Sequence, residues 1–484
     1  MKTEENHRMQ KKGFARNFMM FVIIYGILAS VLFWVVRDDW RKTLITTEPV
    51  NRDVLLPELT EEHEISQDFL TAVDNLQTLT LYTNKHPDAS DESNLTVTFK
   101  SEGEELFSRE IPYAHIPADG VLTVQMENEM QSPKGALATM KVQGEGKISL
   151  WSGSSRAAGK FQVGVETAGL RLDGKPVDGE LVLVQKGEVI LPYADYYWPV
   201  IGVLFLLLCG VILYCHSCTV RQKSNAINRG IALIKQYQYL LKTLVIRDFK
   251  VKYKASVLGI LWSFLNPLLM TFVYMFVFST LFRSSIENFV VYLMSGIILY
   301  NYFSEATNLG MQSIVGNAGL ITKVYMPKYI FPISKVLSSG INLLISLIPL
   351  LIMMALTGVR FSKSLLLIPL VLLFLILFCV GVSLMLSAAM VYFRDIQFIW
   401  GIMLTILNFL SPIFYPESII PARFLTLYHL NPMYQYLFFM RTITLGGISP
   451  TPITYLYCIL ASLGTLAIGL LVFRKSQSQF VLHL

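Results

Sequence analysis

The chain has 484 residues, of which 53% are hydrophobic and only 15% are charged, whereas an ordinary soluble domain has about 25% charged residues. This apolar content excludes a typical cytosolic enzyme, a collagen-like protein and a disordered chain, and a net charge of only +6 argues against a nucleic-acid-binding protein. The composition indicates a membrane protein that crosses the bilayer several times.

The charge is divided unevenly along the chain. Residues 37–195 contain 15 Lys and Arg but 27 Asp and Glu, a net charge of −12. The remaining residues contain 25 basic and 7 acidic side chains, a net charge of +18. Such asymmetry indicates separate domains or compartments, with an acidic block inserted into a basic and apolar chain.

An apolar run over Asn17–Val36 precedes the acidic block. It is preceded by a basic region that contains Arg8, Lys11, Lys12 and Arg16. Its length is about the twenty residues needed to cross the hydrocarbon core. A cleaved signal peptide is the alternative, but the run is long, continues past Ala29-Ser30 and has Leu28 at the minus-three position. We therefore expect residues 1–36 to hold a cytoplasmic N-terminus and an anchor helix.

A second anchor helix is expected within residues 196–216, where the apolar run Tyr197–Tyr214 follows the acidic block. Six further apolar runs raise the expected number of transmembrane helices to eight. They are Gly259–Phe282, Phe289–Leu309, Ile330–Leu356, Leu365–Val391, Ile396–Phe414 and Thr454–Phe473. Basic residues concentrate in alternate loops, so the positive-inside rule places both termini in the cytoplasm and residues 37–195 outside.

Short β-rich stretches with turn-forming residues between them occur throughout residues 37–195. They are Thr78–Tyr82, Asn94–Lys100, Gly120–Met126, Ala138–Val142, Lys147–Trp151, Lys160–Val165 and Glu180–Gln185. This pattern is typical of a β-sandwich or jelly roll. The expected fold is therefore an α-helical multi-spanning membrane protein of about eight helices with an inserted extracytoplasmic β-sandwich or jelly-roll domain.

The role of this β-rich domain stays open at the level of sequence. All five cysteines lie outside it, which excludes a disulfide scaffold. Exposed aromatic rings could stack on sugars, and Tyr82, Tyr113 and Trp151 are the candidates. Binding of another partner, or a simple cap over the membrane part, is an equally valid interpretation.

We find no motif for catalysis or metal binding. Gly153–Lys160 resembles a phosphate-binding loop but has five residues between its glycines and Phe161 in place of Ser or Thr. Cys215-His-Ser-Cys218 resembles half of a zinc site and has no second ligand pair nearby. The only acidic residues after Asp248 are Glu287, Glu305, Asp395 and Glu417. General acid–base catalysis is thus poorly supported, and we expect the chain to bind neither a metal nor a cofactor.

A basic amphipathic segment lies within residues 217–257, directly before the third apolar run. It is expected to lie in the membrane interface with its basic side against lipid headgroups, although an ordinary juxtamembrane segment would look similar. The residues assigned to it are Arg247, Asp248, Lys250, Lys252, Tyr253 and Lys254. The following run is interrupted by Asn266-Pro267. A proline frees a backbone carbonyl, which suits a helix that lines a cavity, but a kinked packing helix is also compatible.

Several separated motifs together resemble one known family. They are Arg247-Asp248, Lys252-Tyr253-Lys254, Ser256, Leu258-Gly259, Leu261-Trp262 and Asn266-Pro267-Leu268. This stretch closely resembles the opening of type-2 ABC exporter permeases, most of all the branch that exports lipid-linked polysaccharides such as O-antigens, capsules and teichoic acids. The resemblance runs from Tyr237 to the C-terminus, roughly half of the chain. The first 220 residues have no counterpart in the usual permease of this family.

The resemblance implies that residues 258–484 form a six-helix permease domain in a bacterial cell membrane. Two copies would work with an ABC ATPase that binds ATP and Mg²⁺, and would move a lipid-linked glycan outward. The segment expected to couple to the ATPase comprises Asn317, Leu320, Ile321, Lys323, Val324, Tyr325, Met326 and Pro327. Tyr392-Phe-Arg-Asp395 matches the second cytoplasmic turn of the family. The outer re-entrant segment is matched by Ser411, Pro412, Tyr415, Pro416, Asn431 and Pro432.

A sugar polymer needs a channel lined by aromatic faces and hydrogen-bonding groups. The candidates are Trp262, Asn266, Tyr274, Tyr300, Asn301, Tyr302, Phe303 and Glu305. There are three rival functions. A membrane glycosyltransferase or polymer-modifying enzyme conflicts with the shortage of acidic residues, and six extra spans would be superfluous in an envelope-glycan sensor. An exporter of a drug, a small lipid or a protein is the nearest alternative.

Overall fold

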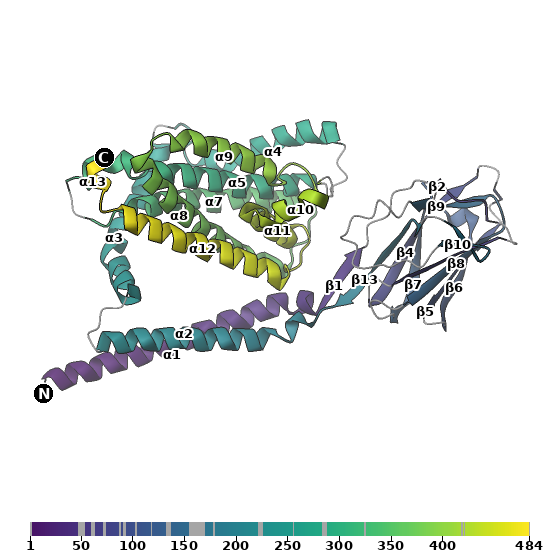
Figure 1. The fold of residues 1–484 in the computed structure, drawn as a ribbon, viewed down its shortest axis with the longest axis horizontal. Coiled ribbons are helices and arrows are strands. Elements are labelled where there is room, and N and C mark those ends of the chain that lie inside the picture. Colours follow the sequence, from purple (N-terminus) through teal and green to yellow (C-terminus); the bar gives the residue numbers. More distant parts are fainter. Residues whose placement is uncertain are drawn as a thin grey trace. The chain divides into compact units, whose positions relative to one another are not determined.

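A computed structural model describes the chain except residues 1, 47–53, 60–62, 71–73, 87–88, 91–92, 102–103, 118, 132–136, 154–169, 178–179, 221–225, 255, 283–287, 324–325, 418–419, 421 and 484. It divides into two compact units, both drawn in Figure 1. We call residues 38–194 the β unit, and residues 1–37 together with 195–484 the helical unit.

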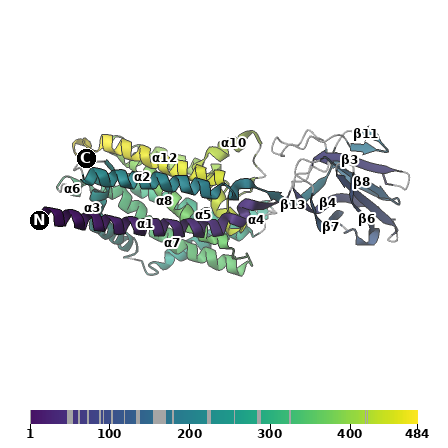
Figure 2. The same ribbon diagram turned by 90° about the horizontal axis from the view of Figure 1, so that it is seen from below.

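The β unit consists of two antiparallel sheets. Its elements are β1 (Lys42–Thr46), β2 (Val54–Leu55), β3 (Glu64–Leu70), β4 (Asn75–Lys85), β5 (Asn94–Ser101), β6 (Glu104–Pro112), η1 (Tyr113–His115), β7 (Val121–Gln131), β8 (Leu137–Gly144), β9 (Ile148–Gly153), β10 (Leu170–Leu172), β11 (Lys175–Val177), β12 (Glu180–Leu181), β13 (Leu183–Ile190) and η3 (Pro192–Ala194). One sheet has the order β1-β13-β4-β9-β12, with β2 beside β9 and β7 beside β4. The other has the order β11-β10-β3-β8-β5-β6, and Figure 2 shows its strands β3, β8 and β6.

The two sheets share one hydrophobic core. Leu79 and Leu81 of β4 contribute to it from the first sheet, and Val97 and Phe99 of β5 from the second. Alternate residues of each strand point into this core, which is the sandwich arrangement expected from the sequence. Six of the seven predicted stretches fall on β4, β5, β7, β8, β9 and β12–β13. The seventh, Lys160–Val165, lies outside the described residues.

The strands β3 and β6 were not anticipated because polar residues interrupt their apolar alternation. In β3, Gln67 is buried two residues after Ile65, and the outer face is polar as well. Glu64 of β3, for example, accepts a hydrogen bond from Lys141 Nζ of β8 at 2.6 Å. Cross-strand ion pairs of this kind stabilise a sheet without an apolar alternation in the sequence. Tyr113 corrects one expectation, since it is fully buried and cannot stack on a sugar, whereas Tyr82 and Trp151 are half-buried.

The burial of Tyr113 gives the β unit a predicted alkaline sensitivity. The phenol donates to Gly146 O at 3.0 Å, and burial raises the pKa of Tyr113 to about 12, against about 10 in an unfolded chain. The neutral phenol is favoured in the folded state, so its contribution is complete below pH of about 10 and is lost as the pH rises toward 12. We expect Tyr113→Phe to lower the free energy of unfolding by about 1 kcal/mol at neutral pH and to flatten this alkaline decline. Thermal melts across this pH range measure both effects, and an unchanged alkaline profile would contradict the assignment.

The helical unit contains the remaining elements. They are α1 (Lys2–Arg41), α2 (Tyr197–Val220), α3 (Ala226–Tyr253), α4 (Leu261–Phe282), α5 (Phe289–Gln312), η4 (Val315–Asn317), α6 (Ala318–Ile321), α7 (Ile330–Leu356), η5 (Lys363–Leu367), α8 (Ile368–Tyr392), α9 (Ile396–Leu410), α10 (Ala422–Leu430), α11 (Pro432–Thr444), α12 (Pro452–Ser476) and α13 (Phe480–His483). The two anchor helices α1 and α2 run side by side in both views (Figures 1 and 2). Tyr25 Oη donates to Ile201 O at 2.8 Å and Tyr197 Oη to Ala29 O at 2.7 Å, which fixes the pair as antiparallel.

Six helices among the described residues are long and apolar enough to cross a membrane: α1, α2, α4, α7, α8 and α12. The sequence pattern predicted eight. Of the other two, α5 has 24 residues but carries polar groups such as Asn301 and Glu305, which lower its hydropathy. Helix α9 has 15 residues and spans about 22 Å, less than the roughly 30 Å of a hydrocarbon core.

The predicted helix Ile396–Phe414 is wrong at its C-terminal end. The helix stops at Leu410, and Ser411 adopts an extended conformation with φ −97° and ψ 126°. The residue before a proline is driven out of the helical region by the proline ring, and Pro412 follows directly. The five residues after Leu410 therefore form a turn.

The centre of the helical unit is α5, which packs against α4, α7, α8 and α11. Helix α12, drawn in yellow in Figure 1, lies along α8. The segment α3 packs on α7 and ends close to α5. This arrangement brings polar residues of α3, α4, α5 and α7 to one place.

Candidate functional site

A polar cavity of about 150 Å³ lies between α3, α4, α5 and α7. Its lining comprises Lys252, Tyr253, Trp262, Ser263, Asn266, Pro267, Ile298, Asn301, Tyr302, Glu305, Ser339, Asn342, Leu343 and Ser346. Pro267 has no backbone N–H, so the carbonyl of Ser263 four residues earlier loses its helical partner. The hydroxyl of Ser346 on α7 donates to this carbonyl at 3.1 Å. The proline thus lies in a cavity-lining helix, and the carbonyl that it frees is satisfied by protein.

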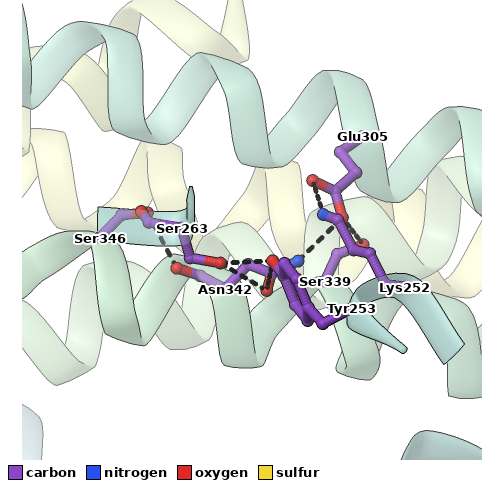
Figure 3. A network of polar contacts seen from close by, with 7 residues as sticks. All are labelled: Lys252, Tyr253, Ser263, Glu305, Ser339, Asn342 and Ser346. Carbon is purple, nitrogen blue, oxygen red and sulfur yellow. Dashed lines mark hydrogen bonds and ion pairs between the residues drawn. The ribbon is translucent and has the colours of Figure 1, made fainter. Parts of the chain in front are cut away.

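The carboxylate of Glu305 is the most heavily bonded group of the cavity (Figure 3). Lys252 Nζ donates to its two oxygens at 2.8 and 2.9 Å. Ser339 Oγ and Asn342 Nδ2 donate to Oε1 at 2.9 and 3.1 Å. The pair Lys252–Glu305 cancels its own charge, so the cavity presents hydrogen-bonding groups without net charge.

Asn342 connects this ion pair to a second cluster of hydroxyls. Its Nδ2 is directed at Glu305, while its Oδ1 accepts from Tyr253 Oη at 2.8 Å and from Ser263 Oγ at 3.3 Å. The hydroxyls of Tyr253 and Ser263 also contact each other. One amide side chain therefore joins α3, α4, α5 and α7 (Figure 3).

Near the C-terminal end of α3, some side chains point into the protein and others are exposed on its surface. Lys252 and Tyr253 turn toward α5 and α7, which differs from the expected position of Lys252 against lipid headgroups. Asp248 is also directed inward, with Oδ2 3.0 Å from Lys335 Nζ of α7 and Oδ1 2.9 Å from Arg247. Arg247 is exposed, as are the other two basic residues assigned to the interface, Lys250 and Lys254.

A second cavity, of about 100 Å³, follows the first along α4 and α5. It is lined by Met270, Tyr274, Ile297, Tyr300, Asn301, Asn408, Ile413 and Phe414. Asn301 lines both cavities. The two cavities therefore lie next to each other along the α4–α5 face, and we call this face, from the end of α5 that leads to α6 onward, the path.

Unpaired amides are exposed along this path. Asn266 and Asn301 are exposed, and neither side chain has a hydrogen-bond partner among the residues that the structure describes. The ring of Trp262 is also exposed, at 45%. An amide without a partner is strongly disfavoured against lipid tails. This face of α4 and α5 must therefore adjoin water, a polar substrate or another copy of the chain.

Three of the expected channel residues are buried and are therefore less accessible to a substrate. Phe303 is buried against Phe378 and Trp400, with ring centroids 5.8 and 6.1 Å apart, and it lines neither cavity, unlike the expectation. Tyr300 is buried and donates to Leu404 O. Tyr302 is buried too, and its hydroxyl is 3.5 Å from Val336 O.

The segment expected to couple to an ATPase follows α5. Asn317 ends η4 and donates from Nδ2 to Ser313 O at 2.7 Å. On α6, Leu320 is 37% exposed, whereas Ile321 is buried at 6% and points into the protein, unlike the expectation. Lys323 is exposed, and the later residues Met326 and Pro327 are half-buried. Val324 and Tyr325 lie outside the described residues.

The segment expected to be re-entrant contains the turn 411–415, α10 and α11. Asn431 caps α11, since its Oδ1 accepts from Met433 N at 3.0 Å, and its Nδ2 donates to Ser411 Oγ at 2.9 Å. Pro432 occupies the first position of α11, where its missing N–H costs nothing. Tyr415, which Pro416 follows, contacts the hydroxyl of Tyr428 at 3.2 Å. The segment is thus a well-bonded unit.

Sequence reasoning missed the contribution of α7. Lys335, Ser339, Asn342 and Ser346 are spaced by four, three and four residues, which places them on one face of a helix. Lys335 pairs with Asp248 of α3, and the other three belong to the network around Glu305 and Asn342. A polar stripe at this spacing in an otherwise apolar span is a recognisable signal.

Comparison with known proteins identifies the family of this chain. A family model described as ABC-2 type transporter matches residues 239–445. The O-antigen export system permease protein RfbA of Myxococcus xanthus is 36% identical over 208 residues, which cover 42% of this chain and 80% of that protein. The chain belongs to the polysaccharide-export permeases of the ABC-2 type transporter family. The resemblance noted in the sequence is thereby confirmed.

Two further relatives of the permease extend this result. The O-antigen export system permease protein RfbA of Klebsiella pneumoniae is 30% identical over 249 residues, 50% of this chain and 95% of that protein. The polysialic acid transport protein KpsM of Escherichia coli is 25% identical over 245 residues, 49% of this chain and 93% of that protein. The family model does not reach residues 1–238 of the permease, which contain the anchor helices and the β unit.

Proposed function

We propose that the chain is the membrane subunit of a bacterial exporter that moves a lipid-linked polysaccharide, such as an O-antigen, a capsule or a teichoic acid, out of the cytoplasm. The single observation that supports this most is the path along α4 and α5, with the exposed amides of Asn266 and Asn301 beside the ring of Trp262. Amides bind hydroxyl groups, and an aromatic ring covers the apolar face of a sugar. The Lys252–Glu305 pair adds no net charge. A polymer of hydroxyl-rich rings suits such a path.

Two copies of the chain and two ATPase subunits would form the exporter, with the path completed between the copies. ATP and Mg²⁺ would be bound by the ATPase, and the chain itself would bind no cofactor and perform no catalysis. Helix α5 leads through η4 into α6, so a displacement of α6 by the ATPase is transmitted directly to the helix that lines both cavities. The ion pairs of α3 with α5 and α7 would make α3 follow this movement.

The orientation that we propose has both termini in the cytoplasm and the β unit outside. The concentration of Lys and Arg in alternate loops between the apolar runs supports it. The exposed residues Lys250 of α3 and Lys254, which follows α3, would contact lipid headgroups at the cytoplasmic surface. The β unit would then meet the glycan after its passage.

Leu320 offers a test of the proposed partnership. We expect Leu320→Asp to abolish co-purification of the ATPase and to reduce surface polysaccharide by at least tenfold, as for a loss of about 1.4 kcal/mol or more in binding. Leu482→Asp, at an exposed leucine of α13, is the matched control. It should retain both the co-purification of the ATPase and the surface polysaccharide. If the wild-type chain bound no ATPase, or cells without it kept their surface polymer, the proposed function would fail.

A further inference from the structure

The turn between α9 and α10 is held by its backbone carbonyls. Arg441 of α11 donates from Nη1 to Pro412 O at 2.7 Å and from Nη2 to Ile413 O at 3.1 Å. Tyr292 of α5 donates to Pro412 O at 3.1 Å and lies 2.6 Å from Tyr415 O. We call Arg441 and Tyr292 the clasp. Because it binds carbonyl oxygens on both sides of Phe414, it fixes the position of that residue.

The clasp is unusual because its charge is not paired with an acid. The guanidinium carbon of Arg441 lies 3.5 Å from the centroid of the Tyr292 ring, a close cation–π contact. Arg441 takes part in no ion pair among the described residues, and its Nε has no hydrogen-bond partner there. An unpaired buried charge is costly. The hydrogen bonds of Arg441 go to the turn and to Tyr292 O at 3.4 Å. The role of Arg441 in the structure is therefore to hold the turn.

The residue that the clasp positions, Phe414, lies at one end of the path. Phe414 is only 7% exposed. Its ring lies 4.7 Å from that of Tyr274 and 5.1 Å from that of Phe278, with which it stacks at an angle of 10°. Both partners belong to α4. Phe414 also lines the second cavity, at the end that is farther along the chain of α4 and away from α6.

We propose that Phe414 is a plug that closes the path at this end, and that Arg441 and Tyr292 are positioning residues that hold it in place. The proposal rests on the proposed function, since it requires that the path carry a substrate. The clasp belongs to α5 and α11, whereas the rings that receive Phe414 belong to α4. A separation of α4 from α5 would therefore withdraw Tyr274 and Phe278 from Phe414 while the clasp stays intact.

The test uses the full chain with its ATPase in vesicles loaded with a small fluorescent dye. Without ATP, wild-type vesicles should retain the dye. Phe414→Ala and Arg441→Gln should each release it roughly tenfold faster, as when the closed state loses about 1.4 kcal/mol. Phe438→Ala, which removes a more exposed ring from α11, is the matched control and should stay tight.

If Arg441 had only a structural role, Arg441→Gln would lower the melting temperature but would not release the dye faster. The combination Phe414→Ala with Arg441→Gln supports the proposal if it leaks no faster than Phe414→Ala alone, because the clasp acts through the plug. Vesicles with Phe414→Ala that stay as tight as wild type would overturn it. Dye release is measured without transport of the glycan. A negative result therefore contradicts the plug and leaves the proposed export function to its own test.

Discussion

Gly469→Ala is expected to destabilise the helical unit strongly. A Cβ atom at Gly469 of α12 would lie 2.3 Å from Gly381 O and 3.0 Å from Gly381 Cα on α8. Conversely, a Cβ atom at Gly381 would lie 2.4 to 2.5 Å from backbone atoms of Thr465 and Leu466. The two helices touch backbone to backbone, which is how small residues pack helices in membranes.

The cost of this substitution is large because no flexible side chain can move aside. Overpacking of a core usually costs about 1–3 kcal/mol, and contacts with backbone atoms belong at the upper end of that range. Separating α8 from α12 would also strain the bond of Ser462 Oγ to Phe374 O, which is 2.9 Å long. We expect a fall in yield and in melting temperature in detergent.

The matched control is on the same helix. A Cβ atom at Gly464 would meet nothing within 4 Å, so Gly464→Ala should leave yield and melting temperature unchanged or slightly raised, since alanine favours a helix over glycine by about 1 kcal/mol. If the two variants melted at the same temperature, the close contact of α8 with α12 would be wrong.

The helices and strands that were predicted correctly are those whose hydrophobic pattern is contained in a few neighbouring residues. The apolar run Ile330–Leu356 coincides with α7, because an uninterrupted run of apolar residues is itself the requirement for crossing a bilayer. The strand β4 was found from its alternation, in which Leu79 and Leu81 face the core. Hydrophobic pattern decides such elements before any long-range contact forms.

The parts that could not be predicted depend on neighbours far away in the chain. Helical periodicity shows that Lys252 is on a basic side of α3 but not that Glu305, 53 residues later, faces it. Likewise, nothing near Arg441 in the sequence indicates that it binds the carbonyl of Pro412, 29 residues earlier. The path residues Asn266 and Asn301 were found, since an amide within an apolar span is conspicuous by itself.

Two ion pairs hold α3 on the helical unit, and their burial decides which one contributes more to stability. In the pair Lys252–Glu305 the side chains are 41% and 33% exposed, so water can replace either partner and the pair is worth about 1 kcal/mol or less. In the pair Lys335–Asp248 they are 24% and 9% exposed. Removal of one partner from a well-buried pair costs roughly 3–5 kcal/mol, because the other charge is left uncompensated. We therefore expect Asp248 to be the main attachment of α3.

Asp248→Asn is accordingly expected to lower the free energy of unfolding by about 3 kcal/mol, since Lys335 loses its only ion-pair partner among the described residues. The double variant Asp248→Asn with Lys335→Met should recover most of this loss, a coupling of up to about 3 kcal/mol. Lys254→Met, at an exposed residue of the same segment, should have almost no effect on stability. Thermal unfolding of the wild type, Asp248→Asn, Lys335→Met and the double variant measures the cycle, with Lys254→Met as the control. Additive losses in the double variant would show that the two residues do not act as a pair, and that α3 is held on α7 by its apolar contacts instead.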